Sequence, residues 1–335
     1  MKNNYILFWS DWDLYTQSFA DLQGLSNTRY INSPTMYMSK IKASIYNEIH
    51  KRPRINKILG KYFKELWIKP EYWYSSYYKD DFNNNNEKVF IFSRTWIQGE
   101  FEKYIDFLKR QYPNSHYVLV LFDLCKKNGG LNIEWVKRNF DIILSFDHGD
   151  CEKYNFIYYP LVFSKFYGEI NKNTHTDVFF CGQPKDRFKE IISCLEKLWE
   201  NEVKTDVHLI WVDPKEQVYK NKITYHDNVI PYRENLNYFL HSNCILEIMQ
   251  GGGLGYTQRM CEAIAFDKKI ITNNPLIHNA PFYNPEYILQ INNANDITPG
   301  LCEKIKKTES VDYQYKEQLS PIKLLEFIEN KLLEL

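Results

Sequence analysis

The stretch EIMQGGGLGYTQRMCEA, residues 247–263, holds four of the thirteen glycines of the chain, at positions 251, 252, 253 and 255. The apolar run before it, CILEIM (244–249), is typical of a buried strand, and YTQRMCEAIAF (256–266) spaces its apolar residues as a helix does. The glycines therefore lie between the end of a predicted strand and the start of a predicted helix. A hinge or a simple turn would use glycine here. So would a loop whose main-chain N–H groups meet a phosphate.

Short apolar runs alternate with helical segments along the rest of the chain. The predicted strands are 5–10, 88–93, 117–122, 141–146, 177–182, 207–212, 228–230, 244–249, 268–273 and 287–292. Because these runs are rich in Ile, Val and Phe and alternate little, we expect both faces to be buried, as in parallel sheets of βαβ units. The predicted helices include 99–112 and 185–202.

The length of 335 residues and a break in the pattern predict two domains. The periodicity lapses at 164–176, which separates an N-terminal domain, 1–165, from a C-terminal domain, 176–318. A last helix, within 319–335, begins with Ser320 as its N-cap and Pro321 as its first helical residue. This helix can cross back to the N-terminal domain.

Composition and charge exclude several classes of protein. The 42 basic and 42 acidic residues cancel, so we predict that nucleic acid is not a partner. The first apolar stretch is too short for a signal peptide, and no run reaches the roughly 20 residues of a membrane span. Seven scattered cysteines without a C-x-x-C pair predict reduced thiols. We therefore expect a cytoplasmic protein.

A basic and aromatic insertion, residues 40–78, interrupts the alternation between the first two predicted strands. Residues 40–64 hold eight Lys or Arg and one acid, Glu48. One interpretation is a solvated helical face with ordinary core aromatics. The other is a peripheral contact with an anionic membrane, in which Trp and Tyr lie at the interface.

The sequence lacks the binding motifs of several common cofactors. The first predicted strand is followed by no glycine motif of the G-x-G-x-x-G kind, so NAD and FAD are not expected. The P-loop, the G-x-S-x-G elbow and the H-E-x-x-H and C-x-x-C metal motifs are absent too. We predict no metal site and no resident cofactor.

Two turns together suit a diphosphate: the glycine run, and the turn after the strand 177–182, where Gly182 is followed by Lys185 and Arg187. A helix N-terminus offers free N–H donors and the positive end of the helix dipole. Glu262 lies one turn beyond the cation Arg259 and is better placed for a sugar hydroxyl of a nucleotide than for phosphate. The predicted binding residues are Gly182, Lys185, Arg187, Gln250, Gly251, Gly252, Gly253, Gly255, Tyr256, Thr257, Arg259 and Glu262. The alternative is a plain turn with a surface Arg259–Glu262 pair.

Residues 228–274, from NVIPYREN to KKIITNN, resemble the nucleotide-sugar-binding domain of GT-B glycosyltransferases. The shared order is a strand, a polar helix, the strand before the glycine turn, the helix with Glu262 and Ala263, and a further strand. The chain is similar in particular to bacterial glycosyltransferases of capsule, exopolysaccharide or lipopolysaccharide assembly, over roughly residues 117–290. The resemblance implies an α/β GT-B fold, two Rossmann-like doubly wound domains facing a cleft.

The resemblance also implies a reaction. A nucleotide-sugar would be the co-substrate, bound by the C-terminal domain with Glu262 on its ribose, and a saccharide or lipid-linked acceptor would meet the N-terminal domain. Many retaining members carry a glutamate eight residues before Glu262; Leu254 stands there, so the stereochemistry stays open.

In an inverting reaction a base must take the proton of the acceptor hydroxyl. We expect this base in the N-terminal domain, beyond the carboxyl end of a strand. The candidates for catalysis are Asp13, Asp147 and His148, and those for acceptor binding are Asp11, Arg94 and Asp123. A nucleotide-sugar 2-epimerase or a non-catalytic partner subunit of the same fold are the alternatives.

Overall fold

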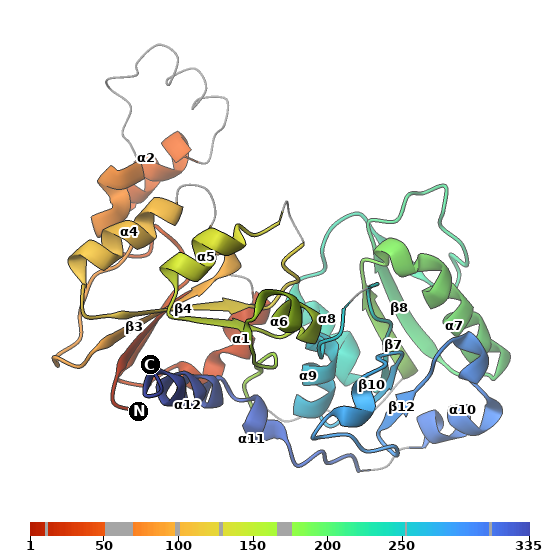
Figure 1. Ribbon diagram of the computed structural model, residues 1–335. Coiled ribbons are helices and arrows are strands. Elements are labelled where there is room, and N and C mark those ends of the chain that lie inside the picture. The colour runs from red at the N-terminus through yellow and green to blue at the C-terminus, as the bar shows by residue number, and fades with distance from the viewer. Residues whose placement is uncertain are drawn as a thin grey trace. The chain divides into compact units, whose positions relative to one another are not determined.

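The computed structural model describes residues 1–10, 13–50, 70–97, 101–126, 130–165, 176–251, 253–307 and 310–335. The chain forms two compact units, one of residues 1–15, 22–144 and 325–335 and one of residues 16–21 and 145–324. Two six-stranded sheets of parallel strands, covered by helices, build the fold (Figure 1). The predicted Rossmann-like α/β architecture is confirmed.

The first sheet has the strand order β2-β1-β3-β4-β5-β6. Its strands are β1 (Asn4–Phe8), β2 (Thr28–Ile31), β3 (Lys88–Ser93), β4 (His116–Leu121), β5 (Ile142–Ser145) and β6 (Ile157–Tyr158). The other elements of the chain up to residue 154 are α1 (Asp13–Ser18), η1 (Ala20–Leu22), α2 (Lys40–His50), η2 (Pro70–Ser76), η3 (Arg94–Trp96), α4 (Phe101–Gln111), α5 (Ile133–Asn139) and α6 (His148–Tyr154), of which α6 belongs to the second unit. β1 is an inner strand between β2 and β3, and all five of its residues are buried.

Aromatic rings fill the core of the first unit. Phe8 of β1 stacks on Phe92 of β3 at 4.7 Å between centroids, and Tyr104 of α4 meets Phe8 edge-on at 5.7 Å. Tyr74 and Tyr77 of the insertion continue this cluster, with their rings 5.3 and 5.1 Å from that of Tyr104. These aromatics of the insertion are therefore core residues, as the first interpretation had it. Residues 51–69 of the insertion lie outside the described residues.

The second sheet has the strand order β12-β11-β10-β7-β8-β9. Its strands are β7 (Thr176–Gly182), β8 (Thr205–Ile210), β9 (Thr224–His226), β10 (Ser242–Glu247), β11 (Lys269–Thr272) and β12 (Ile288–Gln290). Its helices are η4 (Lys185–Arg187), α7 (Phe188–Glu200), α8 (Tyr232–Leu240), α9 (Gln258–Ala265), η5 (Ile277–Asn279), η6 (Ala294–Asp296), α10 (Pro299–Lys306) and α11 (Lys316–Leu319).

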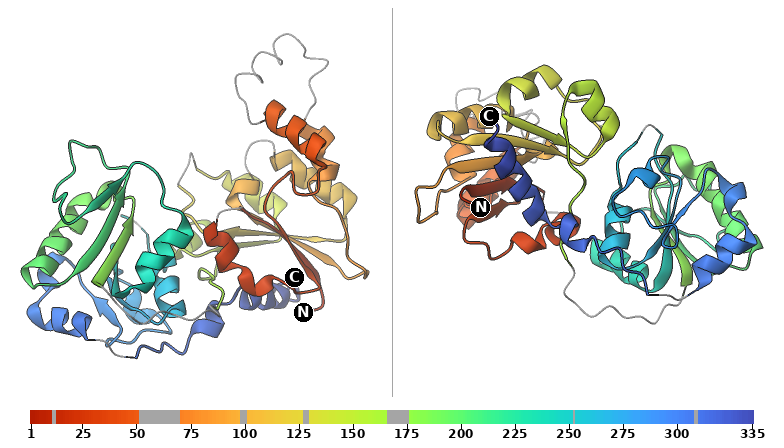
Figure 2. Two further views of the ribbon diagram at one scale, coloured as in Figure 1. Left: turned by 180° about the vertical axis from the view of Figure 1, so that it is seen from behind. Right: turned by 60° about the horizontal axis from the view of Figure 1, so that its bottom comes forward.

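Helices cover both faces of this second sheet (Figures 1 and 2). On one face, α7 and α10 bury Ile191 and Ile305 against strand residues such as Val178 and Phe180. On the other face, Phe179 of β7 meets Phe239 of α8. Consecutive strand residues thus point to opposite helical layers, which explains why the strand sequences are apolar without alternation.

The last helix, α12 (Pro321–Leu332), begins at the proline that the sequence indicated. Within the first unit it brings the two ends of the chain together, since the N-terminal ammonium lies 3.6 Å from Glu329 Oε2 (Figure 1). The helices of the described residues include none that is both long enough and apolar enough to pass through a membrane. All seven cysteines are free thiols.

The predicted strand at 228–230 is wrong. The paired strand is β9, four residues earlier, where Tyr225 and His226 lie beside Leu209 and Ile210 of β8. Val229 is 61% exposed, and the segment runs directly into Pro231 at the start of α8. The short strands β2 and β6 were not predicted, because four and two residues are too few for a pattern.

Candidate functional site

The strand order places a switch point between β7 and β10. The chain leaves β7 through β8 and β9 on one side and returns to β10 on the other side of β7. At such a point the loops after the two central strands diverge and leave a crevice, which is where open α/β sheets bind ligands. Here these loops are residues 183–187 and 248–257, which carry all of the predicted binding residues except Gly182, Arg259 and Glu262.

Arg259, in the first turn of α9, crosses from one loop to the other. Its Nη2 donates to the carbonyl of Cys181, and its guanidinium carbon lies 5.0 Å from the ring centroid of Phe180. The guanidinium packs against Gly182 (φ +151°), where an added β-carbon would lie 2.5 Å from Nη2. Gly182 thus makes room for the cation. The side chain is partly exposed, so its other N–H groups can reach a ligand.

Arg187 has a different position from Arg259. It is buried, and it donates to the carbonyls of Gln183, Pro184 and Ile248. Burial, and then the charge of Arg259, lower its pKa to about 10. Arg187 therefore ties the loop after β7 to the end of β10. Lys185 is exposed beside it, with φ +52°.

Glu247, at the end of β10, was not singled out from the sequence. It is fully buried, and the hydroxyls of Thr257 and Thr272 donate to its two carboxylate oxygens. Burial raises its pKa, and the two hydroxyls and the charges of Arg259 and Arg187 oppose this. Glu247 thus fixes the N-cap residue of α9 and balances the cations. An acid inside the apolar run CILEIM was the available signal, since unpaired charges are rarely buried.

The N–H groups of the glycine loop are largely engaged within the protein. That of Gly251 donates to Asp186 Oδ2 (3.3 Å), that of Gly253 to the carbonyl of Gln250 (3.1 Å), and that of Leu254 to Asp147 Oδ2 (2.7 Å). The side chain of Thr257 does not cap α9. The first N–H groups of that helix are therefore the better donors for an anion. Gly252 lies outside the described residues.

The segment 146–149 holds the other side of the glycine loop. Asp147 is buried and accepts from the N–H of Asp150 (2.9 Å) as the N-cap of α6, besides that of Leu254. An added β-carbon on Gly255 would overlap the carbonyl oxygen of Phe146 and lie 2.7 Å from its ring Cδ2. Asp147 therefore anchors the loop, and Gly255 allows the close approach. This geometry favours a positioning role for Asp147.

Glu262 lies one turn into α9 and is 5% exposed. The hydroxyl of Tyr232 donates to its Oε1 at 2.9 Å. Burial raises the pKa of this carboxyl from 4.5 to about 7, although Tyr232 and the charge of Arg259 oppose the shift. Below about pH 7 the side chain is therefore mostly protonated, and it can both donate and accept a hydrogen bond.

This shift predicts a pH dependence of stability. A carboxyl that binds its proton more tightly in the folded state stabilises the fold below pH 4.5 and loses this contribution as the pH rises towards 7. Between these pH values, the free energy of unfolding of wild type relative to Glu262→Gln should fall by about 3 kcal/mol. Urea unfolding at a series of pH values measures this, with Glu234→Gln, at an exposed position, as the control. Parallel curves for wild type and Glu262→Gln would contradict the assignment.

The first sheet has its own switch point, between β1 and β3, and the described candidates of the first unit follow β1, β3 and the next strand, β4. Arg94 follows β3, is buried, and donates to the carbonyl of Leu124 (2.8 Å). Asp123 follows β4. Burial of Tyr15 raises the pKa of its hydroxyl to about 12, and the charge of Asp123 contributes to this shift. Asp13 begins α1 and is exposed. Asp11 lies outside the described residues.

His148, the first residue of α6, stacks on Tyr158, with ring centroids 3.8 Å apart. It lines a pocket of about 510 Å³ together with Tyr256 of the glycine loop. Among the described residues, no group of three or more His, Cys, Asp or Glu side chains is arranged to hold a metal ion.

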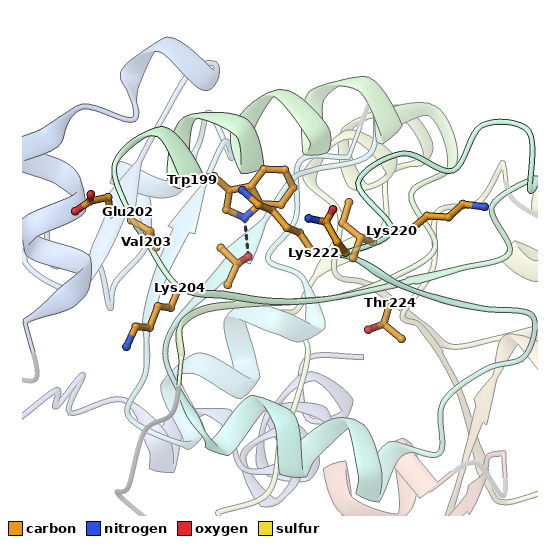
Figure 3. A pocket seen from close by; sticks show the side chains of 10 residues that line it. Trp199, Glu202, Val203, Lys204, Lys220, Lys222 and Thr224 are labelled. Carbon is orange, nitrogen blue, oxygen red and sulfur yellow. Dashed lines mark hydrogen bonds between the residues drawn. The ribbon is translucent and has the colours of Figure 1, made fainter.

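A second pocket, of about 550 Å³, lies at the amino ends of β8 and β9, at the opposite edge of the sheet from the glycine loop. Figure 3 shows Lys204 and Lys220 directed away from the ring of Trp199. Trp199 itself donates to Thr205 (2.8 Å). None of the predicted binding residues lines this pocket, and we place no site there.

Comparison with solved structures supports the fold. An alpha-glucosyltransferase in complex with UDP and a 13-mer DNA containing a HMU base matches with a TM-score of 0.50 at 12% identity, over 90% of this chain and 89% of that chain. The same type of enzyme in complex with UDP and a DNA with a central A:G mismatch matches with a TM-score of 0.49 at 11% identity, over the same shares. A DNA-modifying beta-glucosyltransferase matches with a TM-score of 0.37 at 12% identity, over 67% and 70%.

The chain therefore has the GT-B fold of two Rossmann-like domains. No protein-family model and no curated protein matches the sequence.

The prediction that nucleic acid is not a partner is wrong. A chain of this fold has been solved on DNA, so the fold accommodates such a substrate. The prediction relied on the cancellation of 42 basic and 42 acidic residues over the whole chain. Nucleic acid responds to the charge of the surface that it meets, and a balanced total leaves room for a local basic surface.

Proposed function

We propose that the protein is a glycosyltransferase that uses a UDP-sugar. The observation that carries this proposal is the arrangement at the switch point of the second sheet, where Arg259 lies over Gly182 at the N-terminus of α9. A partly exposed guanidinium beside the main-chain N–H groups of Gln258 and Arg259, at the start of α9, suits a diphosphate. Glu262, one turn further, suits a ribose hydroxyl. The choice of UDP follows the nucleotide bound to the alpha-glucosyltransferase of the same fold.

The reaction breaks the bond between the sugar C1 and the β-phosphate oxygen, and forms a bond between C1 and an acceptor oxygen. The electron pair of the broken bond stays on UDP, whose growing charge Arg259 and the dipole of α9 stabilise. The acceptor proton passes to a base. Because both oxygens of Asp147 already accept N–H groups, Asp13 and His148 remain the predicted candidates.

Two acceptors deserve a direct comparison. A nucleic acid is suggested by the DNA in the solved structure of the same fold. A saccharide or lipid-linked saccharide of bacterial surface polysaccharide synthesis is suggested by the resemblance of residues 228–274.

A panel of UDP-, GDP-, CMP- and dTDP-sugars, screened by thermal shift, tests the donor. We expect the UDP-sugars to stabilise the protein, by about 2.7 kcal/mol at a hundredfold excess over Kd. Labelled sugar is then followed into duplex DNA, single-stranded DNA and oligosaccharides. Absence of any shift would overturn the proposal and leave the non-catalytic partner subunit. Hydrolysis or epimerisation of the nucleotide-sugar in the absence of an acceptor would favour the 2-epimerase.

A further inference from the structure

A pocket of about 510 Å³ in the second unit lies beside the glycine loop. Its walls include the stacked rings of His148 and Tyr158, the ring of Tyr256, Leu276 and two prolines. The volume falls within the range of ligand pockets, about 300–1,000 Å³. No Asp, Glu, Lys or Arg is among the described residues that line it. Its ligand is therefore not expected to be an ion.

Polar groups are nevertheless present in the pocket. Tyr158, Tyr256 and Tyr315 contribute phenol hydroxyls, and Asn279 contributes an amide. All three tyrosines line this one pocket. Burial, and then the charge of Tyr256, raise the pKa of Tyr158. The hydroxyl of Tyr158 is buried and has no hydrogen-bond partner among the described residues. A buried hydroxyl without a partner is costly, and a ligand can satisfy it.

The pocket is held in shape by its surroundings. Phe282 lies between Tyr256 and Tyr315, with its ring centroid 5.0 and 5.1 Å from theirs. Tyr256 directly precedes Thr257, the N-cap of α9, and Asp147 fixes the loop through the N–H of Leu254. The pocket is therefore continuous in sequence and in contacts with the proposed diphosphate site.

We propose that this pocket binds an uncharged pyranose ring, with Tyr158 as a hydrogen-bonding residue. Flat aromatic and proline surfaces suit the C–H face of a sugar, and the phenols and the amide suit its hydroxyls. The inference rests on the proposed function, because the ring is taken to be the donor sugar or a sugar of the acceptor. The chemistry of the two is the same, and the experiment separates them.

The test is Tyr158→Phe, measured by calorimetry with UDP, UDP-glucose and methyl glucoside. Removing a hydroxyl without a partner should leave the stability unchanged or higher. If the pocket holds the donor sugar, the affinity for UDP-glucose falls about fivefold and that for UDP is unchanged. If it holds an acceptor sugar, the affinity for methyl glucoside falls instead. Tyr72→Phe, at a tyrosine that is 66% exposed in the first unit, is the control and should behave as wild type.

Other outcomes overturn the inference. Equal affinities of wild type and Tyr158→Phe for both sugar ligands would do so, as would an equal loss for UDP and UDP-glucose, which would place the nucleotide in the pocket. If wild type binds UDP, binds UDP-glucose no more tightly than UDP, and does not bind methyl glucoside, the pocket assignment fails and the nucleotide site stands. If it binds none of the three, both proposals fail.

Discussion

Arg259→Ala should lower the affinity for UDP and UDP-glucose about 100-fold, because a charge-assisted hydrogen bond to phosphate contributes about 1.5–3 kcal/mol. Arg259 donates to the carbonyl of Cys181, and its side chain is partly exposed. It also lies over Gly182, where the chain leaves room for it. Calorimetry with UDP measures the loss. Transfer should fall at least as far, because the cation also stabilises the leaving group.

Two other arginines separate binding from folding. Arg233→Ala, at an exposed position of α8, should bind UDP as wild type does. Arg187→Ala should lower the melting temperature, because it removes the donor to three carbonyls of the two loops.

Arg259→Lys keeps the charge and loses the planar fork of the guanidinium, so it should recover part of the UDP affinity that Arg259→Ala loses. Unchanged UDP affinity in Arg259→Ala would remove the diphosphate from this switch point.

The sequence predicted the loops of the site because periodicity reveals where strands end. The strand 88–93 was predicted with its observed bounds, and 177–182 and 244–249 were within two residues of β7 and β10. Parallel strands then bring Gly182 and the glycine loop to one edge of a sheet. Which strands are neighbours depends on the crossover, and the placement of β10 beside β7 could be assumed only from the resemblance.

The residues that support the site were harder to predict. Glu247 acts through hydroxyls of Thr257 and Thr272, 10 and 25 residues away, and Asp147 acts on Leu254, 107 residues away. Such contacts have no local spacing. Tyr158 gave no signal either, because nothing in the sequence distinguishes it among the 26 tyrosines, and only the folded chain places it in the pocket. The prediction from net charge that nucleic acid is not a partner failed for a related reason, because a total over the chain does not show where charges gather on the surface.

Gly255→Ala should destabilise the protein by about 3 kcal/mol, at the upper end of the cost of overpacking. The added methyl group would overlap the backbone carbonyl of Phe146 and its ring. A flexible side chain could move away, but here the backbone oxygen precedes Asp147, whose carboxylate holds Leu254 and the N-terminus of α6. The clash would therefore push the glycine loop away from Asp147, the residue that holds the loop in place. Urea unfolding measures the change.

Gly253→Ala is the matched control, because it lies two residues away in the same loop. An added β-carbon there would be 3.5 Å from the carbonyl oxygen of Gln250, an ordinary van der Waals contact, and its φ is not in the left-handed region. Its stability should stay within about 1 kcal/mol of wild type, since Ala restricts the unfolded chain more than Gly does. Equal losses in both variants would mean that the loop needs flexibility throughout, as a hinge would. A loss confined to Gly255→Ala would mean that this glycine is needed for packing against Phe146, and that the loop does not depend on flexibility throughout.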